Sequence, residues 1–151
     1  SFFFLDLDDF KQINDTYGHG TGDQVLRHIA QQIKKRMRPE DLIGRIGGDE
    51  FLIVLPGDFD ANGLSRRAGQ LCEIFSGIHI QTGENGERSA SIHLSGSIGV
   101  SLSPQDGQNY DVLLEKADNA LYAAKQSGKN TWRFYSDQMA SAEKHILSKI
   151  D

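Results

Sequence analysis

The chain has 151 residues, of which 38% are hydrophobic and 25% charged, a balance typical of one globular domain with its own core. The formal net charge of -5 excludes the overall basic surface that duplex nucleic acid requires, so we expect no nucleic-acid partner. No apolar run approaches the roughly 20 residues of a membrane span, and nothing resembles a signal peptide.

The only cysteine is Cys72, so the chain cannot form an internal disulfide. It lies in a helical pattern of apolar residues, which predicts a buried, inert thiol rather than a nucleophile. This cysteine usage fits a reducing compartment. Ser1 opens directly into a strand-like run, so we expect a fragment of a longer protein.

The first predicted element is a strand over residues 2–5, a continuous apolar run followed by Asp6. This is typical of a buried central strand with an acid at its carboxyl end, where ligands collect in open α/β sheets. Asp8 or Asp9 is then expected to cap a short helix. The apolar residues on one face of that helix are Phe10, Ile13 and Tyr17.

Residues 18–23 form a glycine-rich break before a second predicted helix. Its apolar residues at helical spacing are Val25, Leu26, Ile29, Ile33 and Met37. The basic residues 34–36 suit a helix C-terminus, and Pro39 stops the helix.

Residues 45–55 place Gly47, Gly48, Asp49 and Glu50 between two apolar runs, which predicts a tight β-hairpin. Because neighbouring strand residues point to opposite faces, we expect Asp49 and Glu50 to do so. Two acids beside such a turn suggest a metal or proton-transfer site. The alternative is an exposed turn with solvated acids.

A third helix is expected after the cap Asp60 and before Gly77, with its inward residues at Leu64, Ala68, Leu71, Cys72 and Phe75. Residues 78–82 alternate as a strand, residues 83–86 form a turn, and residues 91–95 and 97–101 continue as strands. His79 and His93 are expected on solvent faces of the sheet, because they lack metal-ligand spacing.

A helix from Asp111 to the C-cap Gly128, a strand over 131–135 and a weakly amphipathic helix over 137–150 complete the chain. The element order β-α-α-β-β-α-β-β-α-β predicts an α+β fold, a central mixed β-sheet flanked by helices with a ferredoxin-like arrangement.

If the first strand lies beside the hairpin, Asp6, Asp49 and Glu50 converge on one edge. Such hard oxygen ligands favour Mg²⁺ or Mn²⁺, and Mg²⁺ usually binds one or two carboxylates together with substrate phosphates. Lys125 and Lys129, one helical turn apart, would add positive charge. A metal-dependent nucleotide site is therefore favoured over a structural acidic edge with surface lysines.

Five motifs occur in order: residues 6–15 (DLDDFKQIND), residues 18–19 (GH) with 22–23 (GD), residues 47–51 (GGDEF), residues 117–118 (AD) with 120–122 (ALY) and 124–125 (AK), and residues 128–130 (GKN). Together they resemble the GGDEF family of diguanylate cyclases from residue 2 to about residue 135. The resemblance implies a nucleotidyl-cyclase-like fold that joins two GTP molecules into cyclic di-GMP and releases two pyrophosphates. Two subunits, each holding one GTP, would meet face to face as a homodimer.

The resemblance also implies residue roles. Asp6 and Asp49 would be ligands of two Mg²⁺ or Mn²⁺ ions per GTP, assisted by the Leu7 carbonyl. Glu50 would be a further ligand or would help to deprotonate the 3′-hydroxyl, and Lys11 completes the implied catalytic set with Asp49 and Glu50. The implied substrate-binding residues are Phe10, Asn14, His19, Asp23, Gly48, Lys125 and Lys129, with Asn14 and Asp23 as guanine readers.

Arg38 and Asp41 match the family's product-inhibition motif, Arg-x-x-Asp five residues ahead of the glycine pair. Arginine suits this role because it stacks on guanine and pairs with phosphate. Arg66 and Arg67 are candidates for a second arginine. The alternative is simply a helix end followed by a proline turn.

The resemblance assigns residues 1–136 to the GGDEF domain and residues 137–151 to a helical tail or linker. A helical segment with Asn-Arg-Arg, usual before the first strand, is absent, and residues 83–91 are longer than expected. We expect the domain to face the cytosol, joined to other domains and in a protein whose membrane anchoring is left open. Two alternatives to the cyclase are a non-catalytic module that binds GTP or cyclic di-GMP, and a cyclase acting on ATP, which Asn14 and Asp23 disfavour.

Overall fold

The computed structural model describes residues 1–76, 78–82 and 88–137, with the backbone alone for 79–82 and 88–91. The helices and strands follow one another along the chain as β1 (Phe2–Leu7), α1 (Phe10–Tyr17), α2 (His19–Lys35), β2 (Leu42–Arg45), β3 (Glu50–Val54), α3 (Ala61–Ile74), β4 (Ile78–Thr82), β5 (Arg88–Ile92), β6 (Gly96–Ser101), α4 (Tyr110–Gln126) and β7 (Trp132–Phe134). No helix in these ranges is both long and apolar enough to cross a membrane.

Five strands form one mixed sheet in the order β2-β3-β1-β6-β7. β1 lies at its centre, antiparallel to both β3 and β6, while β7 runs parallel to β6. Residues 3–7 of β1 are all buried, as the continuous apolar run predicts. β4 and β5 form a separate two-stranded sheet. The mixed sheet and its helices confirm the predicted α+β class.

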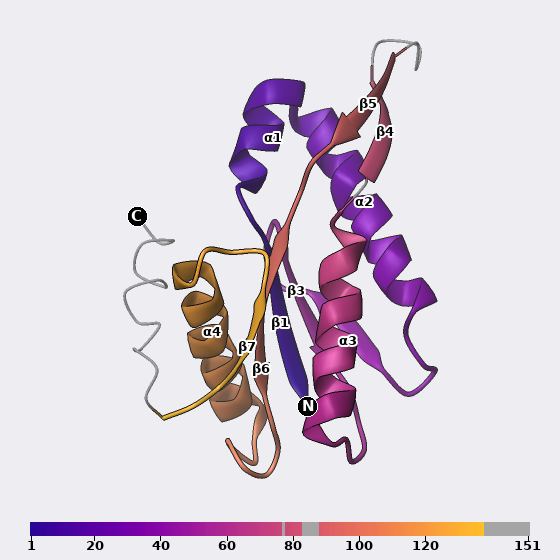
Figure 1. Cartoon of the computed structure of the whole chain (residues 1–151). Coiled ribbons are helices and arrows are strands. Elements are labelled where there is room, and N and C mark those ends of the chain that lie inside the picture. The colour runs from indigo at the N-terminus through magenta and orange to yellow at the C-terminus, as the bar shows by residue number, and fades with distance from the viewer. Residues whose placement is uncertain (77, 83–87, 138–151) are drawn as a thin grey trace.

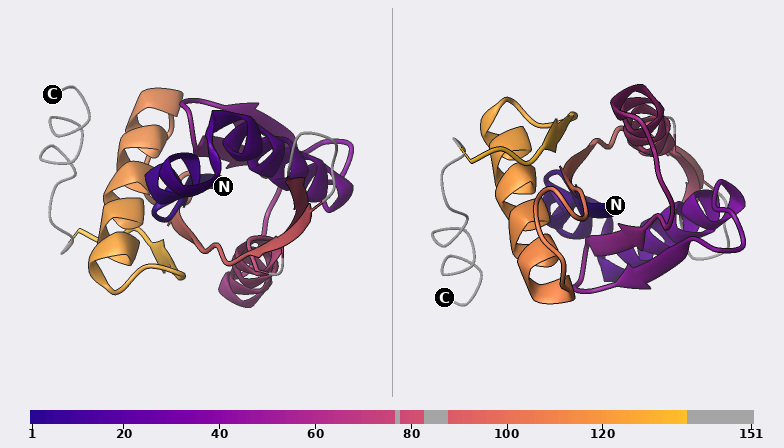
Figure 2. Two further views of the ribbon diagram at one scale, coloured as in Figure 1. Left: turned by 90° about the horizontal axis from the view of Figure 1, so that it is seen from above. Right: turned by 90° about the horizontal axis from the view of Figure 1, so that it is seen from below.

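The helices cover both faces of the five-stranded sheet (Figure 1). α4 lies against one face, and α2 and α3 lie on the other side, as the two end-on views agree (Figure 2). Phe3, Leu5 and Leu7 belong to the large core beneath the other helices, whereas Phe4 packs in a smaller cluster with Leu121 of α4. Because side chains alternate along a strand, Asp6, two positions after Phe4 in β1, also faces α4.

Gly99 on β6 brings α4 close to the sheet. It is the register partner of Phe4, and a Cβ built there would collide with the backbone oxygen of Ala117 and the backbone nitrogen of Leu121. Only a residue without a side chain allows this approach. The glycine therefore determines how closely α4 packs over β1 and β6.

The predicted caps differ in outcome. Asp60 caps α3 by accepting a hydrogen bond from the Gly63 amide at 2.6 Å. Neither candidate cap of α1 behaves this way: Asp9 occupies the N-cap position without a side-chain cap bond, and Asp8 is buried in other contacts. The prediction for α1 was wrong because tertiary partners take both carboxylates.

The glycine-rich break is shorter than predicted. Gly18, at φ 88°, separates α1 from α2, but α2 already begins at His19. Gly22 is therefore helical and buried, and a Cβ there would collide with the Asn14 side chain of α1 and crowd that of Phe10. Close packing of the two helices explains this glycine. At its other end, α2 stops at Lys35, before Met37, which instead packs against the large core.

Three strands, β4, β5 and β6, lie between α3 and α4, whereas the predicted element order has two strands there. β5 ends at Ile92, and residues 93–95 lie outside any strand, so the expected strand over 91–95 was misplaced. His93 is exposed, as predicted. The predictions for Gly77, the His79 side chain, residues 83–86 and the tail helix over 137–150 fall wholly or almost wholly outside the described residues.

Candidate active site

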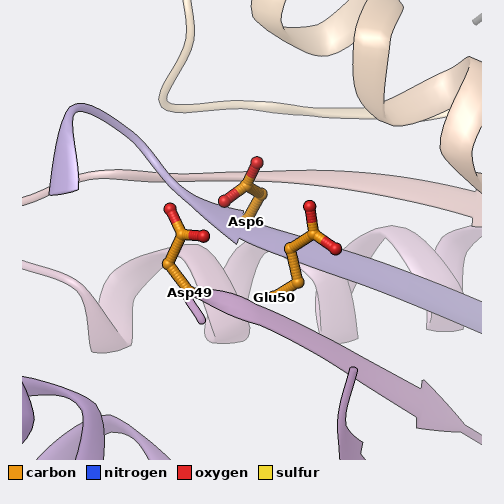
Figure 3. Close-up of side chains that lie close together, drawn as sticks. All are labelled: Asp6, Asp49 and Glu50. Carbon is orange, nitrogen blue, oxygen red and sulfur yellow. The ribbon is translucent and has the colours of Figure 1, made fainter. Parts of the chain in front are cut away.

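Three carboxylates meet where β1 and β3 come together (Figure 3). Asp6, Asp49 and Glu50 each offer an oxygen, and these oxygens all lie within 4.8 Å of one another. Asp6 is 3% exposed, and the other two side chains are half-buried. The predicted convergence of these acids is therefore confirmed.

The sheet register explains this convergence. Asp6 is the direct partner of Glu50 across β1 and β3, and the Leu7 amide donates to the Asp49 carbonyl at 3.2 Å. Glu50 shares the α4 face with Leu52, whose side chain packs in the same small cluster as Phe4. Cross-strand partners at such positions lie about 5 Å apart, which places their side chains together.

The expectation that Asp49 and Glu50 point to opposite faces was wrong. Asp49 precedes β3 and belongs to the turn, so strand alternation does not apply to it. The turn is closed by the Ile46 amide, which donates to the Glu50 carbonyl at 3.0 Å. The Arg45 side chain adds Nε bonds to the carbonyls of Gly47 and Gly48. A firmly closed hairpin therefore carries two acids on one side.

Lys125 of α4 reaches the same place. Its Nζ lies 3.0 Å from Asp6 Oδ2 and 3.8 Å from Asp8 Oδ1. The Lys125 side chain is 17% exposed, so the pair lies at the edge of the interior. Sequence reasoning found Lys125 as a candidate phosphate contact and missed its pairing with both aspartates, because only the position of α4 over β1 creates it.

The donor set fits a hard divalent cation. Within the described part of the chain, this is the group of three acids whose oxygens come close enough to hold one ion, and it contains neither histidine nor cysteine. Carboxylate oxygens without soft ligands are the donors that Mg²⁺ and Mn²⁺ prefer. Asp6, Asp49 and Glu50 are therefore the residues that would hold such an ion.

A pocket of about 400 Å³ opens between α2 and the β2–β3 hairpin. Its lining combines an apolar floor with polar and cationic groups: Asp23, Leu26, Arg27, Ala30, Lys34, Ile43, Gly44, Arg45 and Phe51. Asp23, a predicted guanine reader, is exposed at this pocket. An apolar floor with a few polar groups is typical of small-molecule sites.

The other predicted substrate residues are spread around α1 and the hairpin. Asn14 and Phe10 are half-buried, and both pack against Gly22 of α2, next to Asp23. Lys11 and His19 are exposed. The exposed residue Gly48 lies in the turn beside the carboxylates.

Lys129 pairs with Asp9 rather than with the three central acids. Its Nζ donates to Asp9 Oδ1 at 2.8 Å, and both side chains are about half exposed. This hydrogen bond raises the pKa of Lys129, which therefore stays charged at neutral pH. The two lysines thus hold different carboxylate partners.

Arg38 and Asp41 form a second cluster near the end of α2. The Asp41 side chain is fully buried and accepts from the Arg38 amide at 2.8 Å, from Arg38 Nη2 at 3.1 Å and from Arg67 Nη2 at 2.9 Å. Arg38 also lies over the Phe59 ring, 4.8 Å from its centroid. Arg67 is thus the arginine that joins this cluster, whereas Arg66 is exposed. The sequence left Arg66 and Arg67 open, because both follow the buried Leu64 within one turn of α3.

Opposing effects act on Asp41. Burial would raise its pKa, but the hydrogen bonds from Arg38 and the charges of Arg38 and Arg67 outweigh burial and leave the pKa below its ordinary value.

At Cys72 burial dominates and raises the pKa to about 11, so the half-buried thiol stays protonated at neutral pH. The prediction of an unreactive thiol is thus supported, although the side chain is less buried than expected.

The fold places the chain in the α+β, nucleotidyl-cyclase-like class. The family model described as "Diguanylate cyclase, GGDEF domain" matches residues 1–131. The chain therefore belongs to the GGDEF domain family of diguanylate cyclases, which confirms the resemblance carried by its motifs.

Relatives agree with this assignment. The chain is 35% identical over 144 residues to the bifunctional diguanylate cyclase/cyclic di-GMP phosphodiesterase MucR of Pseudomonas aeruginosa, covering 95% of the chain and 20% of MucR. It is 37% identical over 138 residues to the cyclic di-GMP phosphodiesterase NbdA of the same organism, covering 90% of the chain and 16% of NbdA. The chain thus spans a fifth or less of the length of these curated relatives.

A solved structure is also similar, the GGDEF domain of DgcB from Caulobacter crescentus in complex with c-di-GMP. The TM-score is 0.76 and the sequence identity 30%, and the match covers 88% of this chain and 73% of that one. The likeness therefore extends over most of the described fold.

Proposed function

We propose that this domain is a diguanylate cyclase. The 3′-oxygen of one GTP attacks the α-phosphorus of a second GTP, the bond from that phosphorus to the bridging oxygen breaks, and pyrophosphate leaves. The 3′-proton passes to a base or to solvent. The same step in the opposite direction closes the ring, so two GTP give one cyclic di-GMP and two pyrophosphates.

The observation that carries the proposal is the meeting of Asp6, Asp49 and Glu50 beside the Gly47–Gly48 turn. A glycine turn lets a phosphate approach the backbone closely, and the acids lie directly beside it. Membership in the GGDEF family supports the same reaction.

Each side chain then has a role that follows from its place. Asp6, Asp49 and Glu50, with the Leu7 carbonyl, would hold Mg²⁺ or Mn²⁺. When bound, two such ions supply positive charge at the attacking and leaving oxygens. Glu50, half-buried at the start of β3, lies where it can also accept the 3′-proton.

Cationic side chains would bind the triphosphate. Lys125 already lies at the carboxylates, and Lys129 and Lys11 are exposed on the neighbouring α4–β7 turn and on α1. Positioning and charge stabilisation are the main contributions that a protein makes to phosphoryl transfer. His19 and Gly48 are proposed as further substrate contacts.

Base selection is assigned to the α1–α2 region. Asp23 and Asn14 would accept and donate hydrogen bonds on the guanine edge, with Phe10 beneath the base or ribose. Guanine presents N1–H and N2–H₂ donors that adenine lacks, so an acceptor such as Asp23 favours GTP over ATP. A site whose polar groups lose their partners can discriminate by about 10⁴-fold.

A second copy of the domain is required, because one site holds one GTP and the reaction joins two. We therefore expect a homodimer in which two carboxylate groups face each other. We place the domain at residues 1–136 and propose that residues 137–151 lead toward another domain of the same cytosol-facing chain. The greater length of the relatives supports such further domains.

The cluster of Arg38, Asp41 and Arg67 is proposed as the site where cyclic di-GMP inhibits its own synthesis. Two guanidinium groups around one buried carboxylate are held ready to stack on guanine and to bind phosphate. The related DgcB domain was solved in complex with c-di-GMP, which supports binding of this product by such domains.

The test is direct. The chain, fused to a dimerising segment, is incubated with GTP and Mg²⁺, and the products are separated by chromatography. We expect cyclic di-GMP from the wild-type protein, none after Asp49→Ala, and no dinucleotide from ATP, which also fails to compete with GTP. Absence of product from a folded, dimeric wild-type protein that binds GTP would overturn the proposal.

A second candidate is a regulatory module that binds GTP or cyclic di-GMP without turnover. The relative NbdA supports this second function, because NbdA is named as a phosphodiesterase. Calorimetry of the full-length protein that shows nucleotide binding without product would support this function over the cyclase. The intact Gly47–Glu50 motif ranks the cyclase first.

A further inference from the structure

Asp8 is a buried carboxylate that none of the proposed steps uses. It directly follows β1, is 3% exposed and lies two residues beyond Asp6. Buried acids are rare unless they are fully hydrogen-bonded or paired, so its partners indicate what it does.

Three donors from separate places converge on this side chain. Ser97 Oγ donates to Asp8 Oδ1 at 2.7 Å, and Ser95 Oγ donates to Asp8 Oδ2 at 2.6 Å. The backbone amide of Asn130 also donates to Oδ2, at 3.0 Å. One carboxylate thereby joins the end of β1, the beginning of β6 and the turn that follows α4.

The turn after α4 has an unusual backbone. Lys129 and Asn130 have φ values of 64° and 49°, and Asp9, at φ 55°, completes the set of described non-glycine residues with positive φ. All three meet here, because Lys129 Nζ bonds Asp9 and the Asn130 amide bonds Asp8. Left-handed conformations of such residues persist only where surrounding contacts hold them, and they cluster at functional sites.

The same carboxylate faces Lys125. Asp8 Oδ1 lies 3.8 Å from the Lys125 ammonium, which is itself 3.0 Å from Asp6 Oδ2. The ammonium thus lies between two buried acids and is drawn toward both. Without the charge of Asp8, Lys125 would lose one of the two carboxylates beside it and would compete more strongly for that of Asp6.

We propose that Asp8 is a positioning residue for the metal-binding carboxylates. It holds the end of α4 and the turn over 128–130 against β1, and it shares the charge of Lys125 so that Asp6 stays available to a divalent cation. Groups behind a metal ligand commonly orient it in this way. The inference rests on the metal site of the proposed function.

Asp8→Asn is the discriminating variant. An asparagine oxygen can accept from Ser95 and from the Asn130 amide, while its NH₂ donates to Ser97 Oγ, whose hydroxyl turns to accept. The variant therefore keeps the hydrogen bonds and removes the charge, and a melting curve checks that it folds. Asp8→Ala, which loses three hydrogen bonds, serves only to measure the structural contribution.

The readout is Mn²⁺ binding to the full chain without nucleotide, followed by electron paramagnetic resonance. The relevant site is the one lost in Asp6→Asn. We expect Asp8→Asn to weaken it by about tenfold, the lower end of the range for groups behind a ligand. The matched control, Asp9→Asn, removes an equal charge from the next, exposed residue and should change binding by less than about twofold, because water and salt screen it.

A double-mutant cycle tests the route through Lys125. In a Lys125→Met background we expect the effect of Asp8→Asn to fall below about twofold, since coupled residues are not additive. Wild-type affinity in Asp8→Asn, or an effect equal to that of Asp9→Asn, would overturn the inference while leaving the proposed function intact. Mn²⁺ binding that is indifferent to Asp6→Asn would instead overturn both.

Discussion

Lys125 and Asp6 form an ion pair of 3.0 Å between α4 and β1, although 119 positions separate them in the chain, from 6 to 125. The pair links the helix that covers one sheet face to the strand that carries the first acid of the site. Its side chains are 17% and 4% exposed. It is therefore shielded from water far more than an ordinary surface pair.

Lys125→Met should lower both stability and turnover. Removing one partner of a buried pair leaves the other charge less compensated, and we expect the free energy of unfolding in urea to fall by about 3 kcal/mol. Lys129→Met is the matched control, because that lysine belongs to an exposed pair whose loss should leave stability nearly unchanged. Equal losses in the two variants would contradict the burial argument.

Arg67→Ala and Arg38→Ala should relieve inhibition by cyclic di-GMP. Both arginines bind the Asp41 carboxylate, so each removal dismantles the cluster while the carboxylates at β1 and β3 stay in place. We expect the inhibition constant for the product to rise at least about tenfold, as for loss of a charged contact, with an initial rate close to wild type.

Arg66→Ala is the control for that experiment, because Arg66 is exposed and precedes Arg67 directly. Progress curves with added cyclic di-GMP separate a change in the inhibition constant from a change in the initial rate. A large fall in initial rate after Arg38→Ala, or relief of inhibition by Arg66→Ala alone, would argue against the assigned cluster.

Asp41 should make stability depend on pH in a defined direction. Its pKa is lower in the folded than in the unfolded chain, so the folded state favours the ionised form. The stabilisation is present above the unfolded pKa, about 3.9 for aspartate, and is lost as the pH falls through the lowered folded pKa. Unfolding free energies of wild type and Asp41→Asn should therefore differ most at pH 6–7, roughly two units above that value, and converge toward pH 2.

Gly99→Ala should displace α4. The new Cβ would meet backbone atoms of Ala117 and Leu121, which cannot rotate away as a flexible side chain would. We expect a loss of about 1–3 kcal/mol, the range for overpacking, together with lower turnover of GTP, because the displaced helix carries Lys125, the proposed phosphate contact.

Gly20→Ala provides the contrast for Gly99→Ala. Gly20 lies in the exposed first turns of α2, and a Cβ there meets nothing within 4 Å. Alanine should stabilise this position by up to about 1 kcal/mol through its helix propensity. Chemical denaturation of both variants separates a backbone clash from a general effect of adding a methyl group.

Local patterns were enough to find most elements and the hairpin. The apolar run before Asp6 specified a buried strand, the Asp60 cap and the apolar spacing specified α3, and the glycine pair specified the turn between β2 and β3. Each of these features depends on neighbours within a few residues, so the order of residues alone determines it. The same short-range motifs indicated the family.

The tertiary structure decided which side chains meet. Register across β1 and β3 brought Asp6 to Glu50, the turn placed Asp49 on the same side, and α4 delivered Lys125. Sequence reasoning offered Asp8 or Asp9 as a helix cap, because the long-range partners of Asp8 were not visible along the chain.

The choice between Arg66 and Arg67 shows the same limit. Both follow Leu64 within one helical turn, but only packing of α3 beside the end of α2 brings Arg67 to Asp41, at 2.9 Å. The sequence by itself determined which helices and strands form and which acids and lysines are available for chemistry. The tertiary structure decided their pairing, because ion pairs and hydrogen bonds between residues as distant as Asp8 and Asn130 depend on how whole elements pack.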